Sequence, residues 1–312
     1  MKEFDYKNSE VYFRDSFVPF SEANLSIASS PVLYGLSIYT VFNVVWNEAE
    51  QRLYIFRLRD HFKRLVNSAK ILDFNSFVKE ATYEKFEATM LDLLSRNHVQ
   101  ENVLVRVTIY IDELIAGTKI HDLTNSVSAY IYPMGQILPS NGVNVCVSSW
   151  QRTADNAIPS RAKVNGSYVN ASLMKNEAIL NGYDDAIAID EHGHVAEGTV
   201  ANLFLVRDGV LITPDPATDI LEGITRSTIL TLAKELNIPV EVRSIDRSEL
   251  YMVDEAFMCG SSANVIPVLS VDRRVISTGA GEITSKISQI YEDVRAGKVP
   301  EYTSWLTPVP NA

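Results

Sequence analysis

Lys163 is the residue of this chain that is best placed for covalent chemistry with a carbonyl compound. The amine of a lysine reacts with a carbonyl only while it is neutral, and burial beside another cation lowers its pKa. Arg161 lies two positions before Lys163, and the segment 156–160 that precedes both is uncharged. Most single lysines are solvated surface residues, and Lys175, with polar neighbours in a predicted helix, fits that description. Lys163 is therefore the candidate nucleophile.

Two segments could bind phosphate or another anion through their backbone. Residues 222–225 lead directly into a predicted helix at 225–236, so unpaired N–H groups and the helix dipole would face an anion. The hydroxyl of Thr225 could add a hydrogen bond, or could simply cap the helix. Residues 260–262, Gly-Ser-Ser, offer further amides and hydroxyls on a turn after a predicted strand. These patterns indicate anion binding but do not identify the anion.

Several common catalytic motifs are absent from the sequence. It has no GxGxxG or GxxxxGK[ST] motif, which argues against dinucleotide-dependent dehydrogenases and P-loop kinases, and no HExxH, CxxC or GxSxG motif. His192 and His194 lie in a predicted polar turn without a third ligand nearby, so we expect no metal site. Cys146 and Cys259 are too few and too far apart to indicate a disulfide framework, and we expect buried thiols.

Charge and composition argue against some classes of partner. The 312 residues carry a formal net charge of −11, which disfavours a nucleic-acid groove and a polybasic membrane surface. The stretch 23–47 has no charged residue, but its Ser and Asn residues, Pro31 and Gly35 make it too polar for a membrane helix. The N-terminus lacks the apolar core of a signal peptide. We therefore expect a cytoplasmic protein without a membrane span.

Strand-like and helical patterns are mixed along the whole chain, which predicts an α/β (α+β) fold. The segment YPMGQILPSNG contains two Pro and two Gly without periodicity, so we expect a small α/β domain at 1–132, a linker at 133–142 and a large, strongly β domain at 143–312. Alternation predicts strands or strand pairs at 11–20, 37–46, 52–56, 103–111, 126–132, 143–150, 184–198, 202–214, 240–245, 255–260 and 265–277. Helical periodicity predicts helices at 60–72, 83–97, 167–180, 225–236 and 282–296.

The segment from Glu197 to Arg226 resembles the signature of class IV, or fold type IV, pyridoxal-phosphate-dependent aminotransferases. Three further segments, DHFKRL, SRAKVNGSYVNA and MCGSSANVIPV, resemble other parts of the same family, so the resemblance covers nearly the whole chain. VSSWQR is similar to a stretch that precedes the lysine segment in branched-chain aminotransferases. The matching residues of the signature are Glu197, Thr199, Asn202, Leu203, Phe204, Leu211, Thr213, Leu221, Gly223, Ile224 and Arg226.

The resemblance implies the family's two-domain fold and its cofactor, pyridoxal 5'-phosphate. The smaller N-terminal domain would be α/β, and the larger, β-rich C-terminal domain would bind the cofactor. Lys163 would bond covalently to the cofactor, and Glu197 would lie against the pyridine nitrogen and keep the ring protonated. Tyr168 would hydrogen-bond the phenolic oxygen. The remaining cofactor-binding residues would be Arg64, Leu221, Ile224, Thr225, Ser261 and Ser262.

On the substrate side the chain departs from branched-chain aminotransferases. They usually carry Phe-Glu-Gly where this chain has Tyr39-Thr40-Val41, a tyrosine in place of Leu104, and an interdomain tryptophan in place of Met134, whereas their arginine is kept as Arg106. The resemblance still implies an amino acid and a 2-oxo acid as substrates. The substrate-binding residues would be Tyr34, Tyr39, Arg106 and Ala263.

The expected activity is transfer of an amino group between an apolar, branched-chain L-amino acid and 2-oxoglutarate. A D-amino-acid transaminase and an aminodeoxychorismate lyase share the same cofactor residues, so both remain alternatives. A non-catalytic member of the family is disfavoured, because such a protein would have no need of Lys163, Glu197 and Arg64 together. The family pairs as homodimers, which implies a second copy of this chain as a partner.

Overall fold

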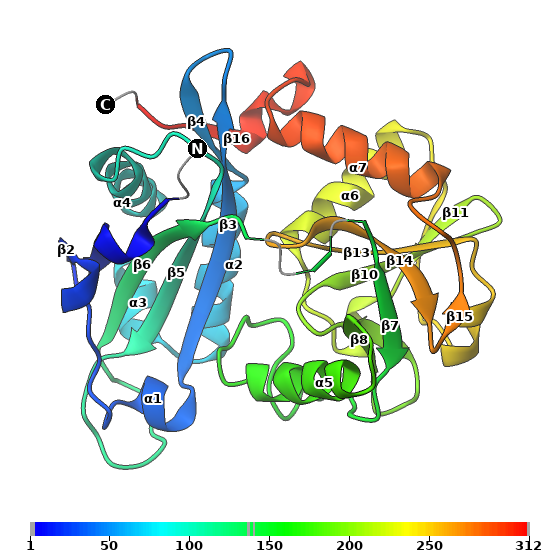
Figure 1. The fold of residues 1–312 in the computed structure, drawn as a ribbon. Helices are drawn as coiled ribbons and strands as arrows, with labels where there is room; N and C mark the ends of the chain where they lie inside the picture. The colour runs from blue at the N-terminus through cyan, green and yellow to red at the C-terminus, as the bar shows by residue number, and fades with distance from the viewer. Residues whose placement is uncertain (1–3, 136–137, 140, 311–312) are drawn as a thin grey trace. The chain divides into compact units, whose positions relative to one another are not determined.

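The structure is a computed structural model that describes residues 4–135, 138–139 and 141–310 (Figure 1). The chain forms two compact units. The first contains the chain up to Gly135, the short segment Ala162–Gly166 and the chain from Val294 onward, and the second contains the intervening segments, the longer being Ser167–Asp293. The predicted ranges 1–132 and 143–312 divide the chain only once, whereas packing returns two later segments to the first unit.

The first unit is built on a seven-stranded sheet in which every pair of strands is antiparallel. Strand β3 of this sheet is buried over nearly its whole length, and most of its residues on both faces are apolar. The order of the strands is β16 (Leu306–Pro308), β4 (Arg52–Phe56), β3 (Ser37–Asn47), β5 (Val103–Ile111), β6 (Asn125–Pro133), β1 (Glu10–Phe13) and β2 (Ser16–Pro19).

Residues 11–20, for which alternation predicted strand structure, form the hairpin of β1 and β2. Arg14 and Asp15 both adopt positive φ angles, 51° and 59°, as a two-residue turn of the mirror-image type requires. The register pairs Phe13 with Ser16 on either side of this turn. The turn itself has no strong local signal in the sequence, because it lacks Gly and Asn.

Helices α2, α3 and α4 pack on the first sheet, against β3, β6 and β1 respectively (Figure 1). The helical periodicity of residues 60–72 corresponds to α2, which buries Leu65 and Ala69 together with the polar residues His61 and Ser68. Thr82 caps α4 by accepting a hydrogen bond from the backbone N–H of Lys85 at 3.3 Å. The helices of this unit are α1 (Ser30–Tyr34), α2 (Leu58–Ile71), α3 (Asn75–Glu80) and α4 (Tyr83–Arg96).

The second unit is built on a nine-stranded mixed sheet. Strand β7 pairs in parallel with both β8 and β14, and β11 pairs in parallel with β12. The Asp208-Gly209 turn between β10 and β11 has two positive φ angles, as is typical of a two-residue hairpin turn. The strands are β12 (Val240–Val242), β11 (Val210–Thr213), β10 (Asn202–Arg207), β13 (Glu255–Gly260), β14 (Asn264–Val271), β7 (Val143–Val147), β8 (Asp185–Ile189), β9 (Val195–Gly198) and, beside β14, β15 (Arg274–Val275).

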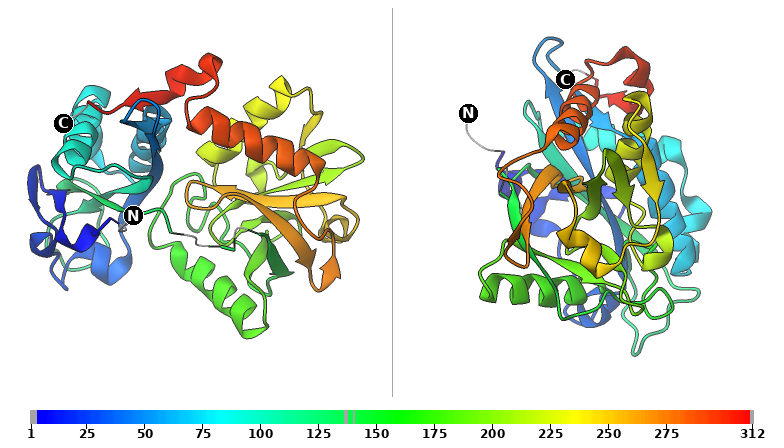
Figure 2. Two further views of the ribbon diagram at one scale, coloured as in Figure 1. Left: turned by 45° about the horizontal axis from the view of Figure 1, so that its top comes forward. Right: turned by 90° about the vertical axis from the view of Figure 1, so that its right-hand side faces the viewer.

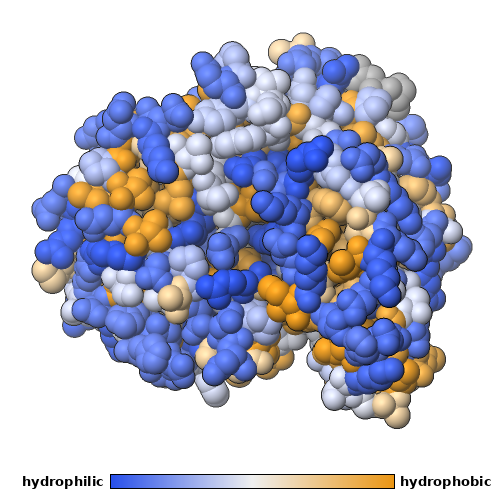
Figure 3. Space-filling model, turned by 180° about the vertical axis from the view of Figure 1, so that it is seen from behind, coloured by the Kyte–Doolittle hydropathy of each residue, from blue (hydrophilic) through white to orange (hydrophobic). Residues whose placement is uncertain are grey.

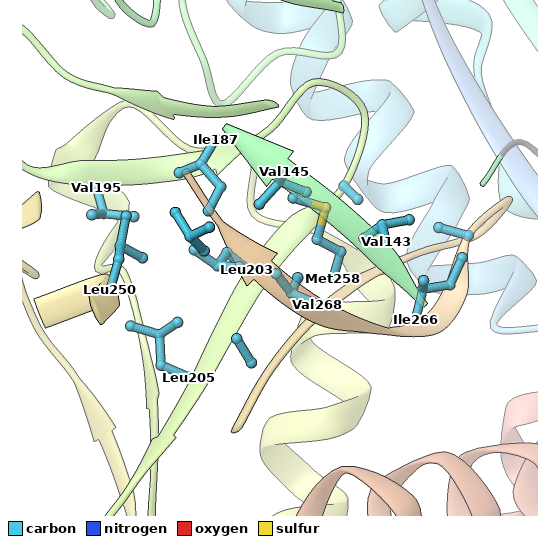
Figure 4. Packing of buried hydrophobic residues seen from close by; sticks show 14 of the residues in the cluster. Val143, Val145, Ile187, Val195, Leu203, Leu205, Leu250, Met258, Ile266 and Val268 are labelled. Carbon is cyan, nitrogen blue, oxygen red and sulfur yellow. The ribbon is translucent and has the colours of Figure 1, made fainter. Parts of the chain in front are cut away.

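Side chains from one face of this sheet converge in a single apolar cluster, which includes Val145, Ile187, Leu203, Met258 and Val268 (Figure 4). Because strands from across the sheet contribute to it, the sheet must curve around the cluster.

The other face of the second sheet is covered by helices (Figures 1 and 2). α5 (Tyr168–Leu180) packs through Ala171, Met174 and Ala178 against small residues of β7, β8 and β9. α6 (Ile224–Glu235) and α7 (Glu282–Arg295) share a second cluster with the stacked rings of Phe204 and Phe257. Short 3-10 turns complete the described chain at Tyr6–Asn8, Phe20–Glu22, Pro216–Thr218, Arg247–Tyr251 and Pro300–Trp305.

Within the described residues, none of the helices combines the length and the apolar composition that crossing a membrane requires. The surface drawn in Figure 3 is largely hydrophilic, and its hydrophobic residues form separate groups.

Candidate functional site

The candidate site residues are divided between the two units. The first unit carries Lys163, Arg64, Tyr34, Tyr39 and Arg106. The second unit carries Tyr168, Glu197, Leu221, Ile224, Thr225, Ser261, Ser262 and Ala263.

The main chain of Lys163 is fixed to the first unit from two sides. Its carbonyl accepts the backbone N–H of Tyr39 in β3 at 3.0 Å, and its own N–H donates to the hydroxyl of Ser68 in α2 at 3.2 Å. A Cβ atom on Gly35, whose φ is +67°, would lie 2.7 Å from the Cα of Gly166, so this approach requires glycine. The segment around Lys163 is therefore held at a defined position beside β3.

The half-buried side chain of Lys163 lies near two of the predicted substrate residues. Its Nζ is 4.9 Å from the centroid of the Tyr39 ring, and the guanidinium carbon of Arg106 is 3.7 Å from the same centroid. Arg106 also donates a hydrogen bond to the side-chain oxygen of Asn165. The first unit thus brings together an amine, an aromatic ring and a guanidinium, and a cation over a ring face is stabilised by the ring quadrupole.

The hydroxyl of Thr40 is hydrogen-bonded to two side chains on one face of α2. Arg64 Nη2 lies 3.1 Å and His61 Nδ1 lies 2.7 Å from the Thr40 hydroxyl. His61, Arg64 and Ser68 are spaced by three and four residues, so they share this face of the helix. Burial, followed by the positive charges of Arg64, Arg57 and Lys163, lowers the pKa of His61 well below its ordinary value.

Two other residues considered for the substrate side occupy different environments. Tyr34, at the end of α1, has 41% of its surface exposed. Leu104 is buried in β5, where it pairs with Asn43 of β3 and Tyr132 of β6. Paired residues of an antiparallel sheet lie on the same face, and so do residues two positions apart in one strand. Leu104 and Arg106 therefore lie on the face of the sheet that also carries Tyr39.

In the second unit, three donors hold the carboxylate of Glu197. Arg152 Nη2 lies 2.9 Å from Oε1, while the side-chain nitrogen of Asn202 and the backbone N–H of Leu221 lie 2.8 Å and 3.2 Å from Oε2. An ionised carboxylate has acceptor sites only, and all three contacts suit that form. Sequence reasoning did not assign a role to Arg152, although it stands in the VSSWQR segment that resembled the family.

The start of α6 has the geometry of an anion site. Gly223 is the N-cap in an extended conformation and provides no side-chain cap, so the first N–H groups of the helix are not satisfied in that way. A Cβ on Gly223 would collide with the side-chain oxygen of Asn202. The side-chain nitrogen of Asn202 donates to the Leu221 carbonyl at 2.8 Å. Thr225 is buried in the first turn. The helix starts at Ile224, one residue before the predicted start.

Arg226, which is part of the signature, makes hydrogen bonds that hold the fold together. It is buried, and its guanidinium donates to the Pro214 carbonyl at 2.8 Å and to the Thr213 hydroxyl at 3.3 Å. Burial lowers its pKa from the ordinary value. These bonds tie the start of α6 to the end of β11.

Ser261, Ser262 and Ala263 form the turn between β13 and β14. Both serines are half-buried, and the Ala263 N–H donates to the Gly260 carbonyl at 3.2 Å, so this amide already closes the turn. Tyr168 is the first residue of α5 and packs against the cluster beneath that helix.

Lys175 differs from the solvated lysine that the sequence suggested, and that expectation was wrong. Its amine donates to the Asp184 carbonyl and lies 3.5 Å from a carboxylate oxygen of the fully buried Asp185. Burial raises the pKa of Asp185. The amine of Lys175 therefore lies beside the carboxyl group of a buried acidic residue.

Neither histidines nor cysteines form a second reactive centre in the described part of the chain. The described residues contain no group of three or more His, Cys, Asp or Glu side chains suited to a metal ion. Cys146 and Cys259 are buried free thiols, and burial raises the pKa of Cys146 to about 11. A thiol with so high a pKa is a poor nucleophile near neutral pH.

Comparisons with known proteins agree on one family. The model of the amino-transferase class IV family matches residues 37–271. A probable branched-chain-amino-acid aminotransferase of Aquifex aeolicus is 41% identical over 304 residues, which are 96% of each chain. The crystal structure of the branched-chain aminotransferase of Thermoproteus uzoniensis with norvaline is 36% identical, with a TM-score of 0.91 over 97% of this chain and 99% of that one.

A second solved structure contains a cofactor adduct. This branched-chain amino acid aminotransferase, from the organism abbreviated T.th., is complexed with N-(5'-phosphopyridoxyl)-L-glutamate. It is 34% identical, with a TM-score of 0.90 over 98% of this chain and 100% of that one. Similarity at this level extends over both units.

Proposed function

This chain belongs to the class IV aminotransferase family and is a pyridoxal-phosphate-dependent enzyme, and from that premise we propose that it moves an amino group between a branched-chain L-amino acid and 2-oxoglutarate. The observation that carries the proposal is the set of three donors around Glu197 together with Lys163 held beside Tyr39 and Arg106. The first set suits the cofactor, and the second suits an acidic or apolar amino acid.

The residues present fit the cofactor by their chemistry. A phosphorylated pyridine aldehyde needs an amine for its carbonyl, an anionic partner for its ring nitrogen and donors for its phosphate, and Lys163, Glu197 and the uncapped start of α6 supply these in turn. When bound, the cofactor withdraws electrons from the substrate's α-carbon, which makes that carbon acidic.

Lys163 is assigned two tasks. Its amine would hold the cofactor covalently through the cofactor's carbonyl carbon, and as a free amine it would move a proton of the substrate as general base and acid. Both backbone groups of Lys163 are hydrogen-bonded, so its main chain is fixed. The fixed main chain limits the positions that the amine at the end of the long side chain can reach.

Glu197 is assigned to the ring nitrogen, and its neighbours keep it in place. With Arg152, Asn202 and the Leu221 N–H as donors, the carboxylate cannot rotate freely. A fixed anion stabilises a positive charge on the ring nitrogen at no cost of reorganisation during reaction. Tyr168 is assigned to the phenolic oxygen.

Phosphate binding is assigned to both units. In the second unit, the N–H groups of Ile224 and Thr225 and the hydroxyls of Ser261 and Ser262 would donate hydrogen bonds to it. In the first unit, Arg64 would supply a formal positive charge.

The substrate assignment rests on the face of the first sheet that carries Tyr39, Leu104 and Arg106. Tyr39 and Leu104 offer apolar surface for a branched side chain, while Arg106 offers a charge for the distal carboxylate of 2-oxoglutarate. Solved relatives hold norvaline and a glutamate adduct, which supports both kinds of substrate. The amides of the Ser261–Ala263 turn would bind the α-carboxylate, with Ala263 constrained by its bond to Gly260.

A second copy of this chain is the proposed partner. α5 exposes Val169, Leu173 and Leu180, of which Leu180 has 77% of its surface exposed, and α1 exposes Val32 and Leu33. Exposed apolar groups on two helices favour an interface in a symmetric dimer. Sedimentation of the purified protein should give twice the chain mass, and a monomer at micromolar concentration would contradict the proposal.

The activity is tested with a panel of L- and D-amino acids and 2-oxoglutarate as acceptor. We expect L-leucine, L-isoleucine and L-valine to be the best donors, with overlap between them, because a methylene changes binding in an apolar pocket by only ~1–3 kcal/mol. Turnover of D-alanine without L-leucine would assign the protein to D-amino-acid transaminases. Elimination from aminodeoxychorismate without amino transfer would assign it to the lyases.

A further inference from the structure

The buried hydroxyl of Thr40 connects two side chains of α2. Thr40 has no exposed surface and lies on the face of β3 that α2 covers, while Tyr39 and Val41 point to the other face. Arg64 Nη2 is 3.1 Å from the hydroxyl oxygen, and His61 Nδ1 is 2.7 Å from it.

One proton arrangement satisfies both hydrogen bonds of the Thr40 hydroxyl. A guanidinium only donates, so Arg64 donates to Thr40. The single proton of the hydroxyl can then go to His61, whose ring is neutral because burial and three nearby cations lower the pKa of His61 well below its ordinary value. A neutral ring has one nitrogen that accepts, and with the acceptor at Nδ1 donation runs from Arg64 to Thr40 to His61.

This arrangement restrains a long, positively charged side chain with a neutral acceptor. A carboxylate at the same place would also restrain Arg64, but it would neutralise the charge and compete with an anionic ligand. A hydroxyl that is itself fixed by His61 holds one N–H of the guanidinium and leaves the positive charge uncompensated by Thr40. Restraint before binding reduces the entropy that the side chain loses on binding.

We propose that Thr40, oriented by His61, is a positioning residue that sets the guanidinium of Arg64 for the phosphate of the cofactor. The proposal rests on the assignment of Arg64 to the phosphate under the proposed function. Thr40 itself touches neither the cofactor nor the substrate in this proposal, so its effect must pass through Arg64.

The experiment compares pyridoxal 5'-phosphate with pyridoxal, which lacks the phosphate. Full-length protein freed of cofactor is titrated with each compound, and binding is followed by absorbance. The variants are Thr40→Val, which removes the hydroxyl, and Thr40→Ser, which keeps it. Thr284→Val is the matched control, because Thr284 is also a buried threonine, and its hydroxyl has no hydrogen-bond partner among the described residues. Thr40→Val and Arg64→Ala are also combined.

We expect Thr40→Val to weaken binding of the phosphorylated compound about tenfold and to change binding of pyridoxal less than about twofold. Thr40→Ser and Thr284→Val should stay near the wild-type protein for both compounds. In the Arg64→Ala background, Thr40→Val should have no further effect, because the group through which it acts is gone.

Four results would overturn the inference. Equal weakening of both compounds by Thr40→Val would show a general structural role, and additive losses with Arg64→Ala would show independent action. If Arg64→Ala alone lost the preference for the phosphorylated compound, and Thr40→Val kept it, the inference would fail while the assignment of Arg64 stood. If neither variant lost that preference, both assignments would fail.

Discussion

Glu197 and Arg152 form a largely buried ion pair, in which Oε1 of the glutamate lies 2.9 Å from Nη2 of the arginine and the side chains are 9% and 13% exposed. The other carboxylate oxygen is held by Asn202 and by the N–H of Leu221. Arg152 also donates to the carbonyl of Asp219 at 3.1 Å, so it links the strand that carries Glu197 to the loop before α6. The carboxylate assigned to the cofactor ring is therefore held by Arg152, a residue to which the sequence assigned no role.

Arg152→Met should lower both turnover and stability. Removing one partner of a buried ion pair leaves the other charge uncompensated, which costs about 3–5 kcal/mol. Urea unfolding and the rate of a single half-reaction measure the two effects. Arg207→Gln is the control, because Arg207 is 38% exposed and its two ion pairs, both at 3.7 Å, should contribute less than about 1 kcal/mol. Equal effects of the two variants would contradict the role given to Arg152.

Lys163 should carry the cofactor covalently. Reduction of the holoenzyme with borohydride, followed by peptide mapping, should place the label on Lys163. Lys175 is the internal control, because its amine already binds the Asp184 carbonyl and neighbours the carboxylate of Asp185. A label on Lys175, or none in protein supplied with the cofactor, would refute the assignment.

Cofactor affinity and turnover should separate between variants. Arg64→Ala and Thr225→Ala should weaken cofactor binding about 10- to 100-fold, as expected for charged contacts to phosphate of ~1.5–3 kcal/mol. Glu197→Gln should mainly slow turnover, because protonation of the ring matters most in the transition state. Titration with the cofactor and single-turnover kinetics distinguish the two. Loss of the cofactor from Glu197→Gln with an unchanged single-turnover rate would reverse the roles.

Arg106→Leu should slow the half-reaction with 2-oxoglutarate more than the half-reaction with leucine. The distal carboxylate needs a positive charge, whereas an apolar side chain does not. Arg106→Lys keeps the charge and should fall between the wild-type protein and Arg106→Leu. The rates of the two half-reactions, measured separately, provide the test. Equal losses in both would assign Arg106, whose guanidinium also bonds to Asn165, to structure.

Stability should fall with pH below about 6.5 because of His61. The pKa of His61 is lowered in the folded protein, mainly by burial and then by neighbouring cations. Below the unfolded value of about 6.5, the unfolded chain binds a proton that the folded chain does not. This contribution is therefore complete above that pH and is lost as the pH falls, by up to ~1.4 kcal/mol per pH unit.

The measurement is the free energy of unfolding between pH 7.5 and 5 for the wild-type protein, His61→Asn and His192→Asn. His61→Asn should flatten the dependence over this range. His192, which is 71% exposed, serves as the control, and its variant should keep the wild-type slope. A slope unchanged by His61→Asn would show that other groups account for it.

Local chemistry in the sequence determined the family, the cofactor and most elements. The turn at Asp208-Gly209 and the stop of α7 before Gly297 follow from residues that tolerate positive φ angles, and the amphipathic stripe of α2 follows from its period. The spacing from Glu197 to Arg226 could be recognised because strand, turn and helix start follow each other without interruption. The functional roles of the individual residues remain predictions.

Only the tertiary structure decided which distant groups meet. Lys163 and Ser68 are 95 positions apart, yet the main chain of one binds the hydroxyl of the other. Arg152 became the partner of Glu197, and Thr40 the partner of Arg64, through the packing of segments that carry no local signal for each other. The periodicity and the turn residues of a segment depend on neighbours in the sequence, so they can be recognised from the sequence alone. Long-range polar partners depend on burial, because a buried polar group needs a donor or acceptor from whichever segment the fold brings to it.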